Sequence, residues 1–460
     1  MSAVARRFLA VLPVLLPALA LATLGAGGAG RAGEPAGHGG PVRSIVLSPD
    51  GRHALTGSFD YSMMYWQAEG ERLTPLSRFS DNDAAVSAVA FVPGSAHALS
   101  ASDDGTISLW DLAAGTRIAR FEGHGHKAVA LAVSADGQWA ASASWDSTVR
   151  LWNLGTLKAG AVLSGHSGAV GSLAFGPGGN TLFSAGHDGI IRQWRLGGAG
   201  ADGELEKVVY SHGWGVNVLK VLGNGTQILF GGLDGAVVVL DTVTGKVIRS
   251  LAGHERPVLS MDVSPDGTLA ATGGADGLIQ VWDTRNWELK FKHAFPYGPV
   301  WAIAIAGDDR SMFFAGINEK VLHWQMVPDK PFDVTSKQVP ERFQNSEITD
   351  PGELYFIRTC SICHTLAPDD ANRAGPTLHG IFGRRVGSLP GYHYSATLKR
   401  ATFIWNEETI DRLFALGPEK FVPGTKMPLQ RMVDAQDRKA LIEYLKRATA
   451  EPAASQQKDR

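Results

Sequence analysis

The sequence predicts a seven-bladed all-β propeller followed by a smaller all-α domain. A chain of 460 residues is longer than one ordinary domain, and its 44% hydrophobic content is enough for more than one core. Its 55 glycines and its low share of charged residues, 19%, suit strands that are joined by tight turns. An internal repeat of 42 to 46 residues covers most of the chain and stops about 130 residues before its end.

The first 32 residues have the three-part pattern of an export signal. Arg6-Arg7 precedes an apolar run, Phe8–Leu24, and small residues follow it. A retained membrane anchor is the alternative, but the run is short for a spanning helix and is interrupted by Pro13 and Pro17. We therefore expect residues 1–32 to be removed on export to the periplasm, which leaves a protein without a membrane span.

The repeat occupies residues 33–327 and is marked by an aromatic or apolar anchor near the end of each unit. The anchors are Trp66, Trp110, Trp152, Trp194, Leu240, Trp282 and Trp324. A turn acceptor stands six positions before each anchor, at Asp60, Asp104, Asp146, Asp188, Asp234, Asp276 and Asn318. Five units place a histidine 28 positions before the anchor, at His38, His124, His166, His212 and His254. A period near 42 residues is that of a four-stranded propeller blade.

The repeat resembles the WD-repeat family, because Gly-His and Trp-Asp pairs recur in it, as at Gly253-His254 and Trp282-Asp283. The resemblance implies a ring closed without free sheet edges. The seventh blade has no clear outer strand after Trp324, so either the segment before Gly37 or Pro331–Val334 must supply one.

Five regularly spaced histidines could be taken for a metal site. In the WD-repeat family, however, the corresponding His, Asp and Trp side chains form hydrogen bonds within a blade. A buried His–Asp pair satisfies polar groups and fixes the strand register. Because the ring also separates the histidines among blades, we expect no metal to be bound by them.

A linker is predicted at residues 328–346, which contain three prolines and many polar residues. We expect a helix to begin after it, with Asp350 as N-cap and Pro351 at the first helical position. Glu353 completes the pattern of a capping box. This helix leads into the motif that decides the chemistry of the C-terminal domain.

Cys360-Ser361-Ile362-Cys363-His364 is the C-x-x-C-H attachment pattern of a c-type haem. Two thiols at this spacing can add to the haem vinyl groups, and the adjacent imidazole then reaches the iron. The alternatives are a redox-active cysteine pair and half of a zinc site, but the remaining zinc ligands are missing, as is a thioredoxin-like context. Because the chain has only these two cysteines, we expect one covalently bound haem c.

Residues 347–451 resemble class I cytochromes c, which are all-α. The matching stretches are Gly375–Gly387, Gly391–Ser395, Trp405 and Pro423–Pro428. The resemblance implies that His364 and Met427 are the two iron ligands and that the carbonyl of Pro376 orients His364. It also implies that Arg384, Tyr394 and Trp405 surround the haem propionates.

A methionine is more often core filler than ligand, and Met432 is the nearby substitute for Met427. The Pro-Gly-Thr-Lys sequence before Met427 favours Met427. The family commonly has a Tyr where this chain has Phe414, so a hydrogen bond near the sulfur is expected to be lost. Residues 452–460 are predicted to form a disordered tail.

These features predict a periplasmic electron-transfer protein that is not itself an enzyme, with the propeller as a docking platform for redox protein partners. One alternative is a subunit of, or electron-accepting domain in, a periplasmic oxidoreductase; another is a haem-bearing sensor or assembly scaffold. A formal net charge of −2 does not indicate nucleic-acid binding. Exposed aromatic residues at one rim of the ring are the candidate partner contacts, namely Phe59, Trp145, Trp214 and Tyr297.

Overall fold

The computed structural model describes residues 37–197, 202–222, 225–296, 298–317, 319–327, 349–361, 363–368, 375–390, 392, 394–423, 425, 427 and 431–449. The predicted export signal, the linker and the C-terminal tail lie outside these residues, as do Tyr297 and Asn318. Among the helices in this part of the chain, none is long and apolar enough to cross a membrane.

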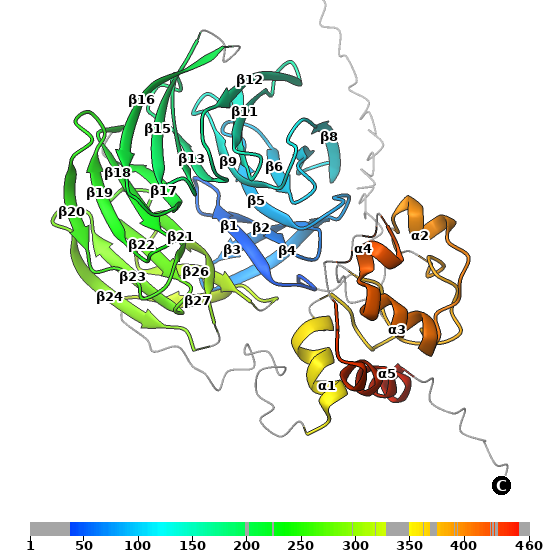
Figure 1. Cartoon of the computed structure of the whole chain (residues 1–460). Helices are drawn as coiled ribbons and strands as arrows, with labels where there is room; N and C mark the ends of the chain where they lie inside the picture. Colours follow the sequence, from blue (N-terminus) through cyan, green and yellow to red (C-terminus); the bar gives the residue numbers. More distant parts are fainter. Residues whose placement is uncertain are drawn as a thin grey trace, which may run out of the picture. The chain divides into compact units, whose positions relative to one another are not determined.

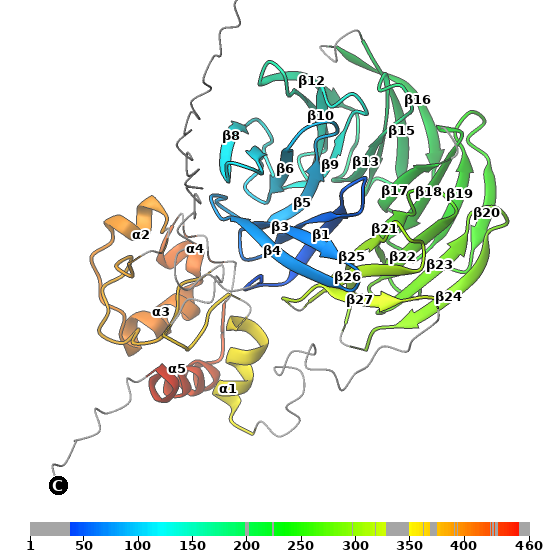
Figure 2. The same ribbon diagram turned by 180° about the vertical axis from the view of Figure 1, so that it is seen from behind.

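Seven antiparallel sheets in the described residues form the blades of a propeller, as predicted (Figure 1). Each sheet is a simple meander whose strands follow one another in chain order. The innermost strands are β1, β5, β9, β13, β17, β21 and β25, and each contacts the innermost strand of the next blade. Contacts between β25 and β1 close the ring (Figure 2). An apolar cluster that joins Val42 and Ile45 to Ala302 and Phe313 lies at this closure.

Blade 1 comprises β1 (Val42–Leu47), β2 (His53–Ser58), β3 (Met63–Glu69) and β4 (Arg72–Phe79). Blade 2 comprises β5 (Val86–Phe91), β6 (His97–Ser102), β7 (Ile107–Asp111) and β8 (Thr116–Phe121). Blade 3 comprises β9 (Ala128–Val133), β10 (Trp139–Ser144), β11 (Thr148–Asn153) and β12 (Lys158–Ser164). Blade 4 comprises β13 (Val170–Phe175), β14 (Thr181–Gly186), β15 (Ile190–Leu196) and β16 (Gly203–Ser211).

Blade 5 comprises β17 (Val216–Leu222), β18 (Gln227–Gly232), β19 (Val237–Asp241) and β20 (Val247–Leu251). Blade 6 comprises β21 (Val258–Val263), β22 (Leu269–Gly274), β23 (Leu278–Asp283) and β24 (Glu288–Ala294). Blade 7 has three strands within the described residues, β25 (Val300–Ile305), β26 (Ser311–Gly316) and β27 (Leu322–Gln325). Both segments that could supply its fourth strand lie outside the described residues.

The second strand of each blade is buried along nearly its whole length, and its last two residues are small. Small side chains let neighbouring blades approach closely, and glycine is required where the approach is closest. A Cβ on Gly231 of β18, for example, would lie 2.5 Å from Cγ1 of Val258 in the next blade. The core of the propeller therefore lies between the blades, and it positions the loops at the rim.

The C-terminal domain is helical, with α1 (Pro351–Tyr355), η4 (Phe356–Cys360), α2 (Ala396–Arg400), α3 (Glu407–Leu416), α4 (Pro418–Phe421) and α5 (Ala435–Thr449). The predicted N-cap is confirmed, because the Asp350 carboxylate accepts the N–H groups of Gly352 and Glu353. The reciprocal bond expected from the Glu353 side chain is not formed among the described contacts. Helix α1 packs on α5, and a Cβ on Gly352 would overlap the Ala440 carbonyl.

Candidate haem-binding site

A single π-helical turn, η4, carries the first cysteine of the attachment motif. The N–H of Ser361 donates to the carbonyl of Phe356 at 2.8 Å, which is the wider spacing of a π-helix. The N–H of His364 then donates to the carbonyl of Cys360 at 2.9 Å. This backbone turn places the two thiols and the imidazole at the wall of one cavity.

All eight residues predicted to bind or surround the haem line this one cavity of the C-terminal domain. They are Cys360, Cys363, His364, Pro376, Arg384, Tyr394, Trp405 and Met427. Sequence reasoning did not single out most of the apolar wall, which includes Leu378, Ile381, Leu413 and Val422. Leu378, Ile381 and Leu413 belong to the core cluster of the domain, so the cavity is a hollow in that core.

The imidazole of His364 is held in one orientation by its backbone neighbours. Its Nδ1 lies 2.8 Å from the carbonyl oxygen of Pro376, which leaves Nε2 to act as a metal ligand. A Cβ at Gly375 would overlap the imidazole ring, so only glycine fits there. This arrangement is the one that the resemblance implied.

Burial raises the pKa of the Cys360 thiol to about 12, with a further contribution from Cys363. A buried neutral thiol suits a permanent thioether better than thiol exchange or thiolate binding to zinc. In the part of the chain that the structure describes, no group of three or more His, Cys, Asp or Glu side chains could hold a metal ion. An imidazole, a thioether and two thiols in an apolar hollow are a donor set that fits haem c.

Met427 and Met432 occupy different environments, although they are five residues apart. Met427 lines the cavity, and its N–H donates to Oγ1 of Thr425 at 3.2 Å. Met432 is buried in the core of the domain, and its N–H donates to the carbonyl of Phe414 at 2.9 Å. Met427 is therefore the methionine that can reach a group in the cavity.

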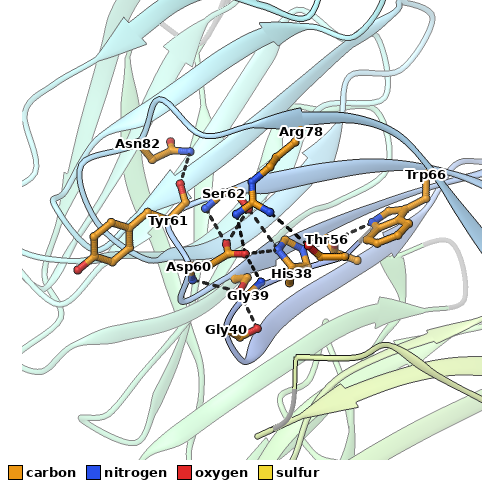
Figure 3. A network of polar contacts seen from close by, with 12 residues as sticks. His38, Gly39, Gly40, Thr56, Asp60, Tyr61, Ser62, Trp66, Arg78 and Asn82 are labelled. Atoms are coloured by element: carbon orange, nitrogen blue, oxygen red, sulfur yellow. Dashed lines mark hydrogen bonds and ion pairs between the residues drawn. The ribbon is translucent and has the colours of Figure 1, made fainter. Parts of the chain in front are cut away.

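The propeller histidines form hydrogen bonds within their blades, as expected. In blade 1, Nδ1 of His38 lies 2.9 Å from Asp60 and Nε2 lies 2.6 Å from Oγ1 of Thr56 (Figure 3). Nε1 of Trp66 donates to the same Thr56 oxygen at 2.7 Å. Burial alone would raise the pKa of Asp60, but His38 and Arg78 outweigh it and lower that pKa.

The same His–Asp contact recurs in blades 3, 4, 5 and 6. Sequence reasoning missed the shared hydroxyl, although a Ser or Thr ten positions before the anchor marks it in five blades. The link from His through this hydroxyl to Trp is complete in blades 1, 3 and 4. In blade 5, Phe230 stands at the position of the hydroxyl and Leu240 at that of the tryptophan. Its His212 contacts Asp234 through Nε2, whereas the other histidines use Nδ1.

Five stretches of the chain match the family described as WD domain, G-beta repeat. They are residues 33–67, 73–111, 115–153, 158–195 and 245–283. The matches leave out β16, β17, β18, β19, β24 and all of blade 7. Blades 5 and 7, which are matched least, are the two in which Phe replaces the shared hydroxyl.

A separate part of the chain is similar to cytochromes c. It is 44% identical to the cytochrome c of Sesamum indicum over 99 residues, which are 22% of this chain and 88% of that protein. It is 38% identical to that of Ginkgo biloba over 111 residues, 24% of this chain and 97% of that protein. For Gibberella zeae the identity is 41% over 98 residues, 21% of this chain and 92% of that protein. The chain belongs to the cytochrome c family.

Two polar residues of the cytochrome c domain are held at the cavity wall by their surroundings. Arg384 donates to the carbonyl oxygens of Thr377, at 2.6 Å, and His379, at 3.1 Å. Burial lowers the pKa of Arg384, and Tyr394 opposes that change. Burial raises the pKa of Tyr394, which keeps its hydroxyl protonated as a hydrogen-bond donor.

Outside the cytochrome c domain, the structure describes three of the four candidate rim contacts. Trp145 is 46% exposed and Trp214 is 67% exposed. Trp145 stacks on His126, with 5.7 Å between ring centroids. Phe59 is partly buried against Trp301 at 5.7 Å. Of these three candidates, Trp145 and Trp214 are therefore the two that are exposed enough to contact a partner.

Proposed function

We propose that this protein carries single electrons in the periplasm through one haem c. The haem is bound covalently by Cys360 and Cys363 and ligated by His364 and Met427. The observation that carries the proposal is that all four side chains line one apolar cavity, in a chain with cytochrome c relatives.

The chain's own residues suit a carrier. When bound, haem c supplies an iron that alternates between the ferrous and ferric states. Pro376 fixes the imidazole of His364, and the soft sulfur of Met427 favours the ferrous state. Leu378, Ile381 and the rest of the apolar wall exclude water. If His364 and Met427 both hold the iron, the site would offer no place for a substrate on it.

We further propose that the propeller rim docks the redox partner. WD repeats support a platform for protein interactions, and exposed tryptophans are frequent hot spots of binding. The N-terminal pattern predicts export of the chain. Export would place the binding of the redox partner in the compartment where the haem is attached.

The attachment is tested with the Cys360→Ala/Cys363→Ala variant, produced in a compartment with haem-attachment machinery. Full-length protein should keep haem in a denaturing gel and show a reversible one-electron transition, whereas the variant should lose covalent haem completely. Ser361→Ala is the matched control, because it alters the same turn and keeps both thiols. Haem that stays attached in the double variant would contradict the proposal.

A further inference from the structure

The innermost strand of every blade contains a β-bulge at its second residue, where its pairing with the next strand shifts by one. A bulge re-aims the side chain of the extra residue. The seven bulged residues are Arg43, Ser87, Val129, Gly171, Asn217, Leu259 and Trp301, and all of them line one cavity of about 780 Å³ along the propeller channel. The bulges therefore form a ring around the channel, and Arg43 is its charged member.

Among the described charged residues that line this cavity, Arg43 is the one without an ion-pair partner. Five charged residues line the cavity, and four of them pair: Lys127 with Asp103 at 2.5 Å, and Lys220 with Asp262 at 3.1 Å. Among the described residues, no carboxylate lies within ion-pair distance of Arg43. The channel wall consequently carries one uncompensated positive charge.

The guanidinium of Arg43 also uses little of its hydrogen-bonding capacity. It offers five N–H donors, and one of them reaches the carbonyl oxygen of Trp301 at a long 3.4 Å. Asp103 forms no ion pair with Arg43; its two oxygens accept from Ser87 at 2.6 Å and from Lys127. Burial lowers the pKa of Arg43, and Asp103 opposes that change. Arg43 is half-buried, so its unused donors remain within reach of an anion in the cavity.

We propose that the propeller channel binds a carboxylate group, which pairs with the guanidinium of Arg43. The planar fork of a guanidinium matches a carboxylate through two parallel hydrogen bonds. Phe59 and Trp301 line the same cavity and pack against each other, which favours an acid with apolar carbons beside its carboxylate. A free short-chain acid and the glutamate side chain of a peptide both present this chemistry.

The site is tested by titration calorimetry on the full-length, haem-loaded protein at constant ionic strength. The probes are glutarate and the tripeptide acetyl-Ala-Glu-Ala-amide, with acetyl-Ala-Gln-Ala-amide as the neutral comparison. Arg43→Gln should weaken binding of the acidic probes by about tenfold or more, because the bidentate pair is lost. Lys220→Gln is the matched control: it removes the same charge from the same cavity, but from a side chain that is already paired, and should leave the affinity nearly unchanged.

Binding of glutarate would identify a free acid as the ligand, and binding of the tripeptide alone would identify an acidic protein segment. Equal losses in Arg43→Gln and Lys220→Gln would overturn the proposal, as would the absence of measurable heat with either acidic probe. Arg43→Lys keeps the charge without the fork, so it should fold even if Arg43→Gln does not, and it should bind more weakly than the unaltered protein. The haem spectrum of each variant, expected to be unchanged, separates this site from the proposed electron transfer.

Discussion

His364, the proposed iron ligand, shows how a few neighbours fix the orientation of a side chain. One carbonyl oxygen, that of Pro376, sets the direction of the imidazole, and the missing side chain of Gly375 leaves room for the ring. The ring is positioned by backbone atoms, which move less than side chains when the surroundings change. Met427 is supported differently. It lines the same cavity, and its N–H donates to Oγ1 of Thr425.

Met427→Leu should abolish the near-infrared band that arises from sulfur bound to ferric iron, and should lower the reduction potential. Leucine keeps the volume and removes the soft ligand, while His364 and the two thioethers still hold the haem. Met432→Leu is the control and should keep the band, because Met432 belongs to the core and does not line the cavity. A band that disappears in Met432→Leu and persists in Met427→Leu would reverse the assignment.

Ser142→Ala should destabilise the propeller by about 1–3 kcal/mol, because one buried hydroxyl serves both His124 and Trp152. The change leaves a ring nitrogen and an indole N–H without a partner. Ser164→Ala, at an exposed position of the same blade, is the control and should have little effect. The readout is the thermal midpoint of the β-sheet circular dichroism; equal midpoints for the two variants would show that the hydroxyl contributes nothing.

The blades repeat one backbone plan with different polar interiors. In blade 2, Asn82 replaces the histidine and contacts the hydroxyl of Ser100, and in blade 7 Phe314 replaces the hydroxyl. The resemblance to WD repeats implied the His–Asp pairs, and the 42-residue spacing predicted the blades. It could not predict that Trp282 of blade 6 leaves the network, since that depends on a small difference in side-chain position.

Stability of the propeller should fall as the pH is lowered below about 6.5. Burial lowers the pKa of His124, His166 and His254, more than their aspartates raise it. The unfolded chain therefore binds more protons than the folded chain in this range, and stability is retained above the ordinary histidine pKa and lost beneath it. Thermal midpoints between pH 5 and pH 8 measure the decline.

The variant His124→Asn copies the residue that blade 2 uses at this position. It should be less stable at pH 8 and should decline less steeply toward pH 5, because one titrating group has been removed. Parallel curves for the variant and the unaltered protein would show that His124 does not contribute to the acid sensitivity.

The whole chain contains two kinds of hydrophobic core, one in the helical domain and one in the propeller. The main apolar cluster of the helical domain draws its members from residues 355–445, whereas the propeller clusters lie within and between blades. The C-x-x-C-H motif predicted Cys360, Cys363 and His364, because its chemistry is local, and the resemblance to class I cytochromes c implied the other five predicted cavity residues. The apolar wall, the π-turn and the bulge at Arg43 were not predicted, because each depends on how distant segments pack.

The Trp145→Ala/Trp214→Ala variant should exchange electrons with the redox partner at least about tenfold more slowly, because it removes the two exposed tryptophans of the rim. Reduction by ascorbate, which needs no docking, should keep its rate. Leu205→Ala/Val243→Ala is the control, since it removes exposed apolar side chains from the outer strand and an outer turn. An unchanged exchange rate in the tryptophan variant would exclude this rim as the docking face.

The shared hydroxyl also determines where the ring proton of the histidine resides. An indole nitrogen only donates, so the hydroxyl oxygens of Thr56, Ser142 and Ser184 accept from tryptophan, and each hydroxyl has its own proton left for Nε2 of the histidine. In blade 3, Nε2 of His124 is then the unprotonated nitrogen, and Nδ1 carries the hydrogen that points at Asp146, 2.9 Å away. The hydrogen bonds of this blade run in one direction, from the tryptophan on the third strand to the carboxylate in the turn. Blade 4 differs, because Nδ1 of His166 also lies 2.7 Å from a guanidinium nitrogen of Arg192, which only donates.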